Sequence, residues 1–151
     1  MTTVSSLSAA KAILEADDTL LAAATGGIYD LDETGPQGIN RTITPAAFDA
    51  NGIIKPCILL KLRSSEPDPY LADEGARYVG VREMLEVWFY EDSGYSNIET
   101  MRNRVWALLH AVQLSGTFMC LWAGDVRNQR DTELDANVER STYQVTTSKS
   151  A

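Results

Sequence analysis

The sequence predicts an α+β domain in which a mainly antiparallel sheet of about four or five strands packs against two main helices as a two-layer sandwich. Apolar residues recur at helical spacing in two separate stretches, at 5–24 and 96–115. Runs rich in β-prone residues occupy 57–63, 79–90, 117–123 and 136–147. The chain has 151 residues, of which 44% are hydrophobic, and this suits a single domain that spans 1–151.

The first helical stretch, 5–24, carries Leu7, Leu14 and Leu21 on one face. Asp17 interrupts that face, and its carboxylate is placed to cap a second short helix at 18–24 by accepting from the free amides of a new first turn. Gly26-Gly27 ends the helical pattern, because glycine adopts the left-handed conformation at little cost. A short strand is expected at 28–31.

The segment 32–55 carries several turn signals, among them Gly35-Pro36, Thr44-Pro45 and Asn51-Gly52. Loops longer than about 15 residues are uncommon in compact domains and tend to be functional or disordered. We interpret this segment as a long loop or projecting arm. A surface insertion without fixed structure is the alternative.

The strand predicted at 79–90 has two unlike faces. Its alternation directs Leu85, Val87 and Phe89 to one side. Trp88 and Tyr90 point to the other side, which is too aromatic for simple exposure and is expected to be covered by a neighbour. Before this strand, Glu66-Pro67-Asp68-Pro69 is expected to break the chain into a polar connection.

The second helix has the clearest boundaries. Ser96 and Glu99 match a capping box, and Gly116 is expected to end the helix. One apolar stripe runs between them, formed by Ile98, Met101, Val105, Leu108, Leu109 and Val112. A polar connection at 124–135 is expected to join the last two strands.

A catalytic or metal site is not predicted. His110 is the only histidine, so any mechanism that needs an imidazole must use it, and we interpret it as a structural or interface residue. Neither a metal-binding nor a phosphate-binding motif occurs, and acidic pairs such as Asp73-Glu74 are expected to be solvated charge. Cys57 and Cys120 are expected to be buried free thiols in a reducing compartment. We therefore expect no enzyme activity, cofactor or metal.

The net charge of −8 argues against non-specific nucleic-acid binding, which requires Lys and Arg to neutralise phosphates. The chain starts without a basic segment followed by an apolar one, so no secretory signal is expected. No apolar run approaches the roughly 20 residues that span a bilayer. The sequence therefore favours a soluble protein that is made in a cytoplasm and has no membrane partner.

The unusual residues are those of an interaction surface. Arg102, Trp106 and His110 follow at four-residue spacing, so they share one flank of the second helix. Arg102 is expected either to lie over the Trp106 ring or to contact a neighbouring subunit together with it. With Trp88 and Tyr90 they form the candidate subunit interface, because Trp, Tyr and Arg are enriched at interface hot spots. The alternative for Trp106 is packing inside its own subunit.

Several segments resemble the tail terminator, or tail completion, proteins of long-tailed phages. Residues 13–20 and 26–30 are similar to the opening helix, turn and first strand of that family. Residues 87–90, 94–96 and 98–109 are similar to its central strand, turn and second helix. The similarity touches about two-thirds of the chain, and the 32–55 segment is longer than in the shorter forms of the family.

The resemblance implies a ring, usually a hexamer, that caps the growing tail tube and stops the addition of tube protein. It implies as partners the chain itself, the tail tube protein and a connector protein of the head or neck, with DNA passing through the lumen without being read. It places the protein at the head-proximal end of the virion tail, after assembly in the host cytoplasm. The alternatives are another head–tail connector, such as a stopper or adaptor, or a small ligand-binding or enzymatic α+β domain.

Overall fold

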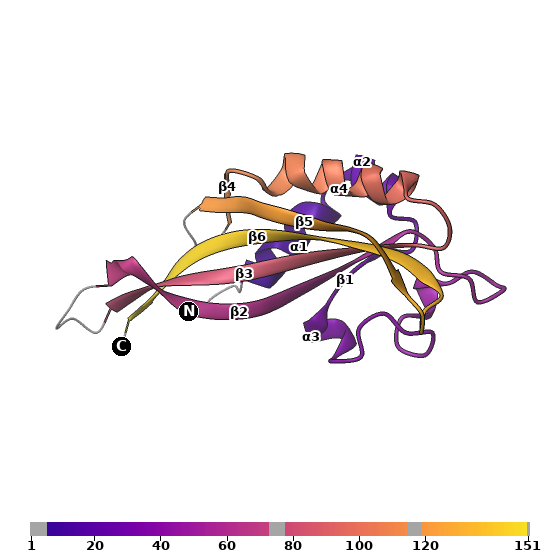
Figure 1. Ribbon diagram of the computed structural model, residues 1–151, viewed down its shortest axis with the longest axis horizontal. Coiled ribbons are helices and arrows are strands. Elements are labelled where there is room, and N and C mark those ends of the chain that lie inside the picture. Colours follow the sequence, from indigo (N-terminus) through magenta and orange to yellow (C-terminus); the bar gives the residue numbers. More distant parts are fainter. Residues whose placement is uncertain (1–5, 73–77, 115–118, 151) are drawn as a thin grey trace.

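The computed structural model describes residues 6–72, 78–114 and 119–150. In this part of the chain, helices pack on one six-stranded sheet whose strand order is β1-β2-β3-β6-β5-β4 (Figure 1). The helices are α1 (Ser6–Glu15), α2 (Asp18–Ala23), α3 (Leu31–Thr34) and α4 (Ser96–Leu109), with a 3-10 turn, η1, at Pro45–Ala47. The strands are β1 (Ile28–Asp30), β2 (Cys57–Ala72), β3 (Tyr78–Glu91), β4 (Val112–Gln113), β5 (Met119–Asp131) and β6 (Ala136–Ser150). Gly116 and the pair Asp73-Glu74 lie outside the described residues.

The predicted α+β class is confirmed, but the sheet differs from the expected mainly antiparallel one of four or five strands. It is mixed, because β1 pairs with β2 in parallel, while β2–β3, β3–β6, β6–β5 and β5–β4 pair antiparallel. The sequence pattern did not reveal β4. This strand is two residues long and exists only through its pairing with Met119 and Cys120, a long-range contact that leaves no local pattern.

The N-terminal helices follow the prediction closely. Asp17 caps α2, and its Oδ2 accepts the Leu20 N–H at 2.8 Å. The same carboxylate pairs with Arg104 of α4, whose Nη2 lies 2.6 Å from Oδ1. One side chain therefore begins α2 and also fastens it to α4.

The expected break at Pro67 is wrong, because β2 continues to Ala72 with a register shift after Pro67. Beyond Leu60, where β1 ends, no described strand lies on the outer side of β2. Proline is tolerated on an edge strand because its missing N–H removes no ladder hydrogen bond. Pro67 therefore disturbs the pairing locally but does not end the strand.

The expected polar connection 124–135 is also wrong for most of its length. β5 extends to Asp131, and only the short turn before Ala136 separates it from β6. Register shifts after Trp122 and after Val126 interrupt the β5–β6 pairing. β5 is largely exposed, so its polar composition reflects solvent contact rather than loop structure.

The start of α4 corrects the predicted capping box. Tyr95 occupies the cap position without a side-chain hydrogen bond. The free amides of the first turn are instead satisfied by Glu91 at the end of β3, whose Oε2 accepts from Asn97 N at 3.1 Å and Ile98 N at 3.2 Å. A buried carboxylate from the strand thus replaces the predicted Ser96–Glu99 pair.

Both faces of the sheet carry buried apolar residues. On one face α1, α2 and α4 cover Leu85, Val87 and Phe89. On the other, side chains of the 36–56 segment pack against Tyr90 in a smaller cluster, formed by Ile39, Ala47, Phe48, Ile54, Cys57, Leu59, Tyr90, Ala136 and Val138. The 32–55 segment is thus mostly irregular backbone that covers part of its own sheet.

Candidate subunit interface

The five residues predicted to form a subunit interface lie on two different surfaces. Trp88 and Tyr90 of β3 point to the sheet face opposite α4, whereas Arg102, Trp106 and His110 lie on α4 or at its end. The structure therefore brings the members of each group together but does not join the two groups within one subunit.

Arg102, Trp106, His110 and the nearby Trp122 of β5 form a surface that we call the helix flank. Trp106 and Trp122 are 46% and 45% exposed. The Trp106 ring stacks on His110 with centroids 4.9 Å apart, and His110 Nδ1 accepts the Trp122 backbone N–H at 3.1 Å. β4 pairs with Met119 and Cys120, so the backbone amide of Trp122 lies beyond the β4–β5 ladder. The His110 imidazole accepts from this amide in place of a strand partner. His110 therefore holds the end of α4 to β5 and fixes the position of Trp106.

Arg102 is held inside the subunit. It is 7% exposed, its Nη1 pairs with Glu139, and its Nε lies 3.7 Å from Asp125 Oδ2. It does not stack on Trp106, since the cation–π contacts of the described residues involve other pairs. The expected stacking of Arg102 on Trp106 is therefore wrong, and its contact with a neighbouring subunit stays a prediction. Within the subunit Arg102 forms a buried ion pair with Glu139, and Arg127 lies 3.8 Å from the same carboxylate.

A pocket of about 240 Å³ opens between Trp106 and Trp122, and we call it the flank pocket. Asp125 lines it and is held by the Ser141 hydroxyl, which donates at 2.6 Å, and by Trp122 Nε1, which donates at 3.0 Å. Tyr143 also lines the pocket. Its ring is fully buried, and its hydroxyl has no hydrogen-bond partner among the described residues. Burial also raises the pKa of Tyr143, so the hydroxyl stays protonated near neutral pH.

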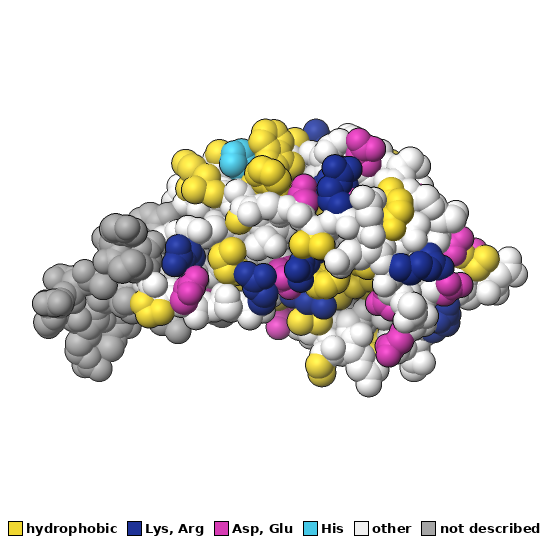
Figure 2. Space-filling view, viewed as in Figure 1, with side chains coloured by type: hydrophobic (Ala, Val, Ile, Leu, Met, Phe, Trp, Pro, Cys, Tyr) yellow, Lys and Arg dark blue, Asp and Glu magenta, His cyan; other side chains and the backbone are white. Residues whose placement is uncertain are grey.

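On the opposite side, Lys61, Arg63, Trp88 and Arg140 surround Glu86 and form what we call the open sheet face. Lys61 Nζ and Arg140 Cζ lie 4.3 and 5.3 Å from the centre of the Trp88 ring, a cation–π arrangement. Trp88 Nε1 donates to Glu86 at 3.3 Å, and Glu86 Oε2 lies 3.3 Å from Arg140 and 3.6 Å from Arg63. Two arginines thus share one carboxylate, and Lys61 lies over the neighbouring Trp88 ring, in a chain whose net charge is −8. Figure 2 shows Lys and Arg side chains gathered with hydrophobic ones in the middle of the molecule.

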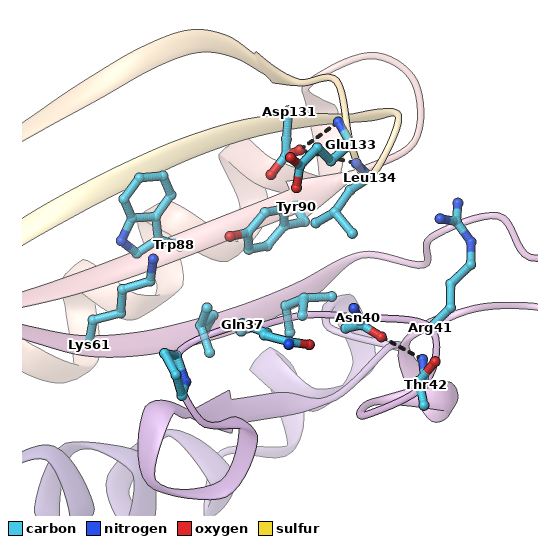
Figure 3. A pocket seen from close by; sticks show the side chains of 14 residues that line it. Gln37, Asn40, Arg41, Thr42, Lys61, Trp88, Tyr90, Asp131, Glu133 and Leu134 are labelled. Carbon is cyan, nitrogen blue, oxygen red and sulfur yellow. Dashed lines mark hydrogen bonds between the residues drawn. The ribbon is translucent and has the colours of Figure 1, made fainter.

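Tyr90 is only 5% exposed and belongs to the smaller core. Burial raises the pKa of its hydroxyl. It borders a hollow of about 770 Å³ between residues 36–42 and the β2–β3 face, with Trp88 and Lys61 at one end (Figure 3). Within its own subunit Tyr90 is therefore covered by the 36–56 segment rather than by a neighbour.

The large hollow is lined by four titratable side chains, those of Lys61, Tyr90, Asp131 and Glu133, and by Arg41. Its lining contains no histidine or cysteine. Asp131 lies at its rim, where Oδ1 accepts the backbone N–H groups of Glu133 and Leu134, both at 3.0 Å, so this carboxylate organises the β5–β6 turn. Within the described ranges no group of three or more His, Cys, Asp or Glu side chains is placed to hold a metal ion.

Both cysteines are free and buried, as predicted. Cys57 belongs to the smaller core and Cys120 to the helix-side core, and burial raises the pKa of each thiol to about 12. No helix in the described part of the chain is long and apolar enough to cross a membrane.

Sequence reasoning missed Trp122 and the three cations of the open sheet face. Lys61 and Arg63 stand at alternate positions of an otherwise apolar run, which was a usable signal for a charged face. Arg140 pairs with Trp88 only through the β3–β6 register, which a single sequence does not reveal.

Comparison with known proteins identifies a fold. No family model matches the chain, and no curated protein matches it. Among solved structures, a chain of the "Virion of native gene transfer agent (GTA) particle" superposes with a TM-score of 0.62. It is 14% identical, and the match covers 93% of this chain and 92% of that chain. At this identity the likeness shows that the two chains share a fold over nearly their whole length.

Proposed function

We propose that the chain is a structural, non-enzymatic subunit of a phage-like virion. It forms a ring at the head-proximal end of a tail tube, ends tube polymerisation and joins the tail to the head. The observation that carries this proposal is the fold shared, over nearly the whole of both chains, with a chain of a gene transfer agent virion. The resemblance of residues 13–20, 26–30, 87–90, 94–96 and 98–109 to tail terminator proteins supplies the place in the tail and the hexameric state.

The exposed surfaces support assembly. A ring uses heterologous contacts, so each subunit must present two different surfaces. The helix flank and the open sheet face meet that requirement, because they lie on opposite faces of the sheet and each exposes aromatic or charged groups of the types common at interfaces. The partners are further copies of the chain, the tail tube protein and a connector protein of the head or neck.

The electrostatics support passage of DNA without binding. A net charge of −8 repels phosphates at long range, so DNA is expected to cross the lumen without being retained. The protein belongs in the mature virion tail and is assembled in the host cytoplasm.

The proposal is tested by adding the purified chain to polymerising tail tube protein and measuring tube lengths by electron microscopy. We expect short tubes with a ring at one end. A variant with Trp106→Ala and Trp122→Ala, folded by circular dichroism, is expected to leave tubes long. Tubes that keep their length with the parent chain would refute tail termination, and binding to a connector protein alone would make the chain a stopper or adaptor.

A further inference from the structure

We infer that the flank pocket of one subunit receives the Arg63 side chain from the open sheet face of a second copy. The inference rests on the proposed ring and specifies which two surfaces meet at each junction. The evidence is the composition of the pocket, the unmatched charge of the sheet face and the different sides of the subunit on which the two lie.

The flank pocket has the chemistry of a cation site. Trp106 and Trp122 border it, and indole rings attract Lys and Arg cations through their electron-rich faces. Asp125 supplies a carboxylate whose side chain is 19% exposed. Tyr143 forms part of the pocket wall, and its hydroxyl oxygen is itself buried. Arg102 also lines the pocket. Its Nη1 pairs with Glu139, and its Nε lies 3.7 Å from Asp125 Oδ2, so an incoming cation would share Asp125 with Arg102.

Arg63 is the best placed cation to enter such a pocket. It lies at a bulge of β2, between the paired positions Leu62 and Ser64, and bulges redirect side chains. Its side chain is 49% exposed, and its Nη1 lies 3.6 Å from Glu86, which is longer than a strong ionic hydrogen bond. Arg63 therefore has donors to spare for a partner.

The surroundings of Arg63 also suit an aromatic surface. Leu121 and Met119 on β5 are 41% and 49% exposed. Leu121 pairs with Gln144 of β6, and Gln144 pairs with Met84 of β3. Met84 in turn pairs with Ser64 of β2, the residue next to Arg63. Apolar side chains in this row can pack against Trp106 and Trp122 of the second copy.

A second copy fits this face better than nucleic acid does. The helix flank is aromatic, and its Arg102 is balanced by Glu139 and Asp125, whereas the sheet face holds two arginines beside Glu86 and Lys61 over Trp88. Their contact matches cations with indole rings, while the net charge of −8 opposes the approach of a phosphate polymer. Since the two surfaces differ, the contact is head-to-tail, which is the type of contact that a closed ring requires.

The test mixes two half-defective variants at a concentration at which the parent chain forms rings. The flank variant carries Trp106→Ala and Trp122→Ala, and the sheet variant carries Lys61→Gln and Arg63→Gln. Each alone is expected to be monomeric by light scattering. Mixed in equal amounts they should form heterodimers of twice the 16.6 kDa chain mass, because one intact flank meets one intact sheet face. Leu21→Ala and Lys55→Gln, an exposed apolar residue and a cation elsewhere, are matched controls that should assemble normally.

If the flank variant does not fold, a second measurement on single substitutions still tests the pairing. Arg63→Gln alone should weaken each junction roughly thirtyfold, the usual loss at an interface hot spot, and Arg63→Lys should recover part of it. In an Asp125→Asn background the same change should have a smaller effect, since the pair is already broken.

Parent rings together with a mixture that stays monomeric would overturn the pairing but leave the ring intact as a proposal. The pairing is likewise overturned if Arg63→Gln assembles normally, or if it loses affinity for double-stranded DNA while rings persist. A parent chain that forms no ring at any concentration or on tube ends would instead remove the proposed function itself.

Discussion

At the scale of single residues, Asp17 shows how one carboxylate serves two elements. It caps α2 through Leu20 N and pairs with both Nε and Nη2 of Arg104, at 2.8 and 2.6 Å. The hydrogen bond from Arg104 is the main cause that lowers the pKa of Asp17 from 3.8 to about 2. The cap was predictable from its position between two apolar stretches. The partner on α4, 87 residues away, was not.

The lowered pKa predicts a pH-dependent contribution to stability. A carboxyl whose pKa is depressed on folding stabilises the native state above its unfolded pKa, and this contribution is lost as pH falls through the folded value. Asp17→Asn keeps a capping oxygen but removes the charge. We expect the parent to have the higher urea midpoint near neutral pH and the difference to vanish between about pH 4 and about pH 2. A difference that persists at the acid end would show that the Arg104 pair is not its source.

At the scale of elements, α4 separates what local sequence can and cannot determine. Its apolar stripe was found from spacing alone, and the buried residues Ile98, Met101, Val105 and Leu109 confirm it within α4. The prediction was wrong at the C-terminal end, because the helix ends at Leu109 and Val112 belongs to β4. The start of the helix was assigned to the wrong side chains, because Ser96 and Glu99 match the local capping pattern while the actual acceptor, Glu91, belongs to the preceding strand.

Replacement of Glu91 tests this correction. Glu91→Ala removes the acceptor for two backbone amides and is expected to cost about 1–2 kcal/mol of unfolding free energy, the usual range for a lost helix cap. Ser96→Ala is the matched control and should change stability by less than about 0.5 kcal/mol, as surface substitutions do. The comparison uses urea denaturation of both variants. Equal losses would restore the capping box.

The same contrast between local and long-range information explains the rest of the fold and the interface. Strands 57–63 and 79–90 were visible because their residues alternate or are apolar throughout. The polar halves of β2 and β5 were not, because they are strands only through pairing with β3 and β6. Trp106 and His110 were placed together correctly by helical spacing. Trp122 joins them from β5, and no pattern in one sequence links it to α4.

Within one subunit, the irregular 36–56 segment is held against the sheet by apolar packing in the smaller core. Phe48 is 8% exposed in the smaller core, and Arg41 lies over its ring at 4.9 Å. Phe48→Ala should therefore loosen the segment while the helix-side core stays folded. We expect much faster trypsin cleavage after Arg41 with little change in circular dichroism. If trypsin cleaves the parent after Arg41 as fast as it cleaves the Phe48→Ala variant, the packing of Phe48 does not hold the segment.

At the scale of the whole molecule, the two faces of the sheet are covered to different extents. α1, α2 and α4 bury one face (Figure 1), whereas the other is covered by the 36–56 segment around Tyr90 and leaves Trp88 only partly buried. Trp106 and Trp122 remain half-exposed at the helix flank. A subunit that places its aromatic and cationic groups on two separate surfaces is suited to repeated contact with copies of itself.

Light scattering after gel filtration tests the ring most directly. Over a series of protein concentrations, the parent chain should pass from the 16.6 kDa monomer to one discrete species with six times that mass, without a continuous series of larger aggregates, because a closed ring stops growing. Electron microscopy of that species should show an annulus. A chain that stays monomeric at every concentration and forms no annulus on tail tube ends would contradict the proposal.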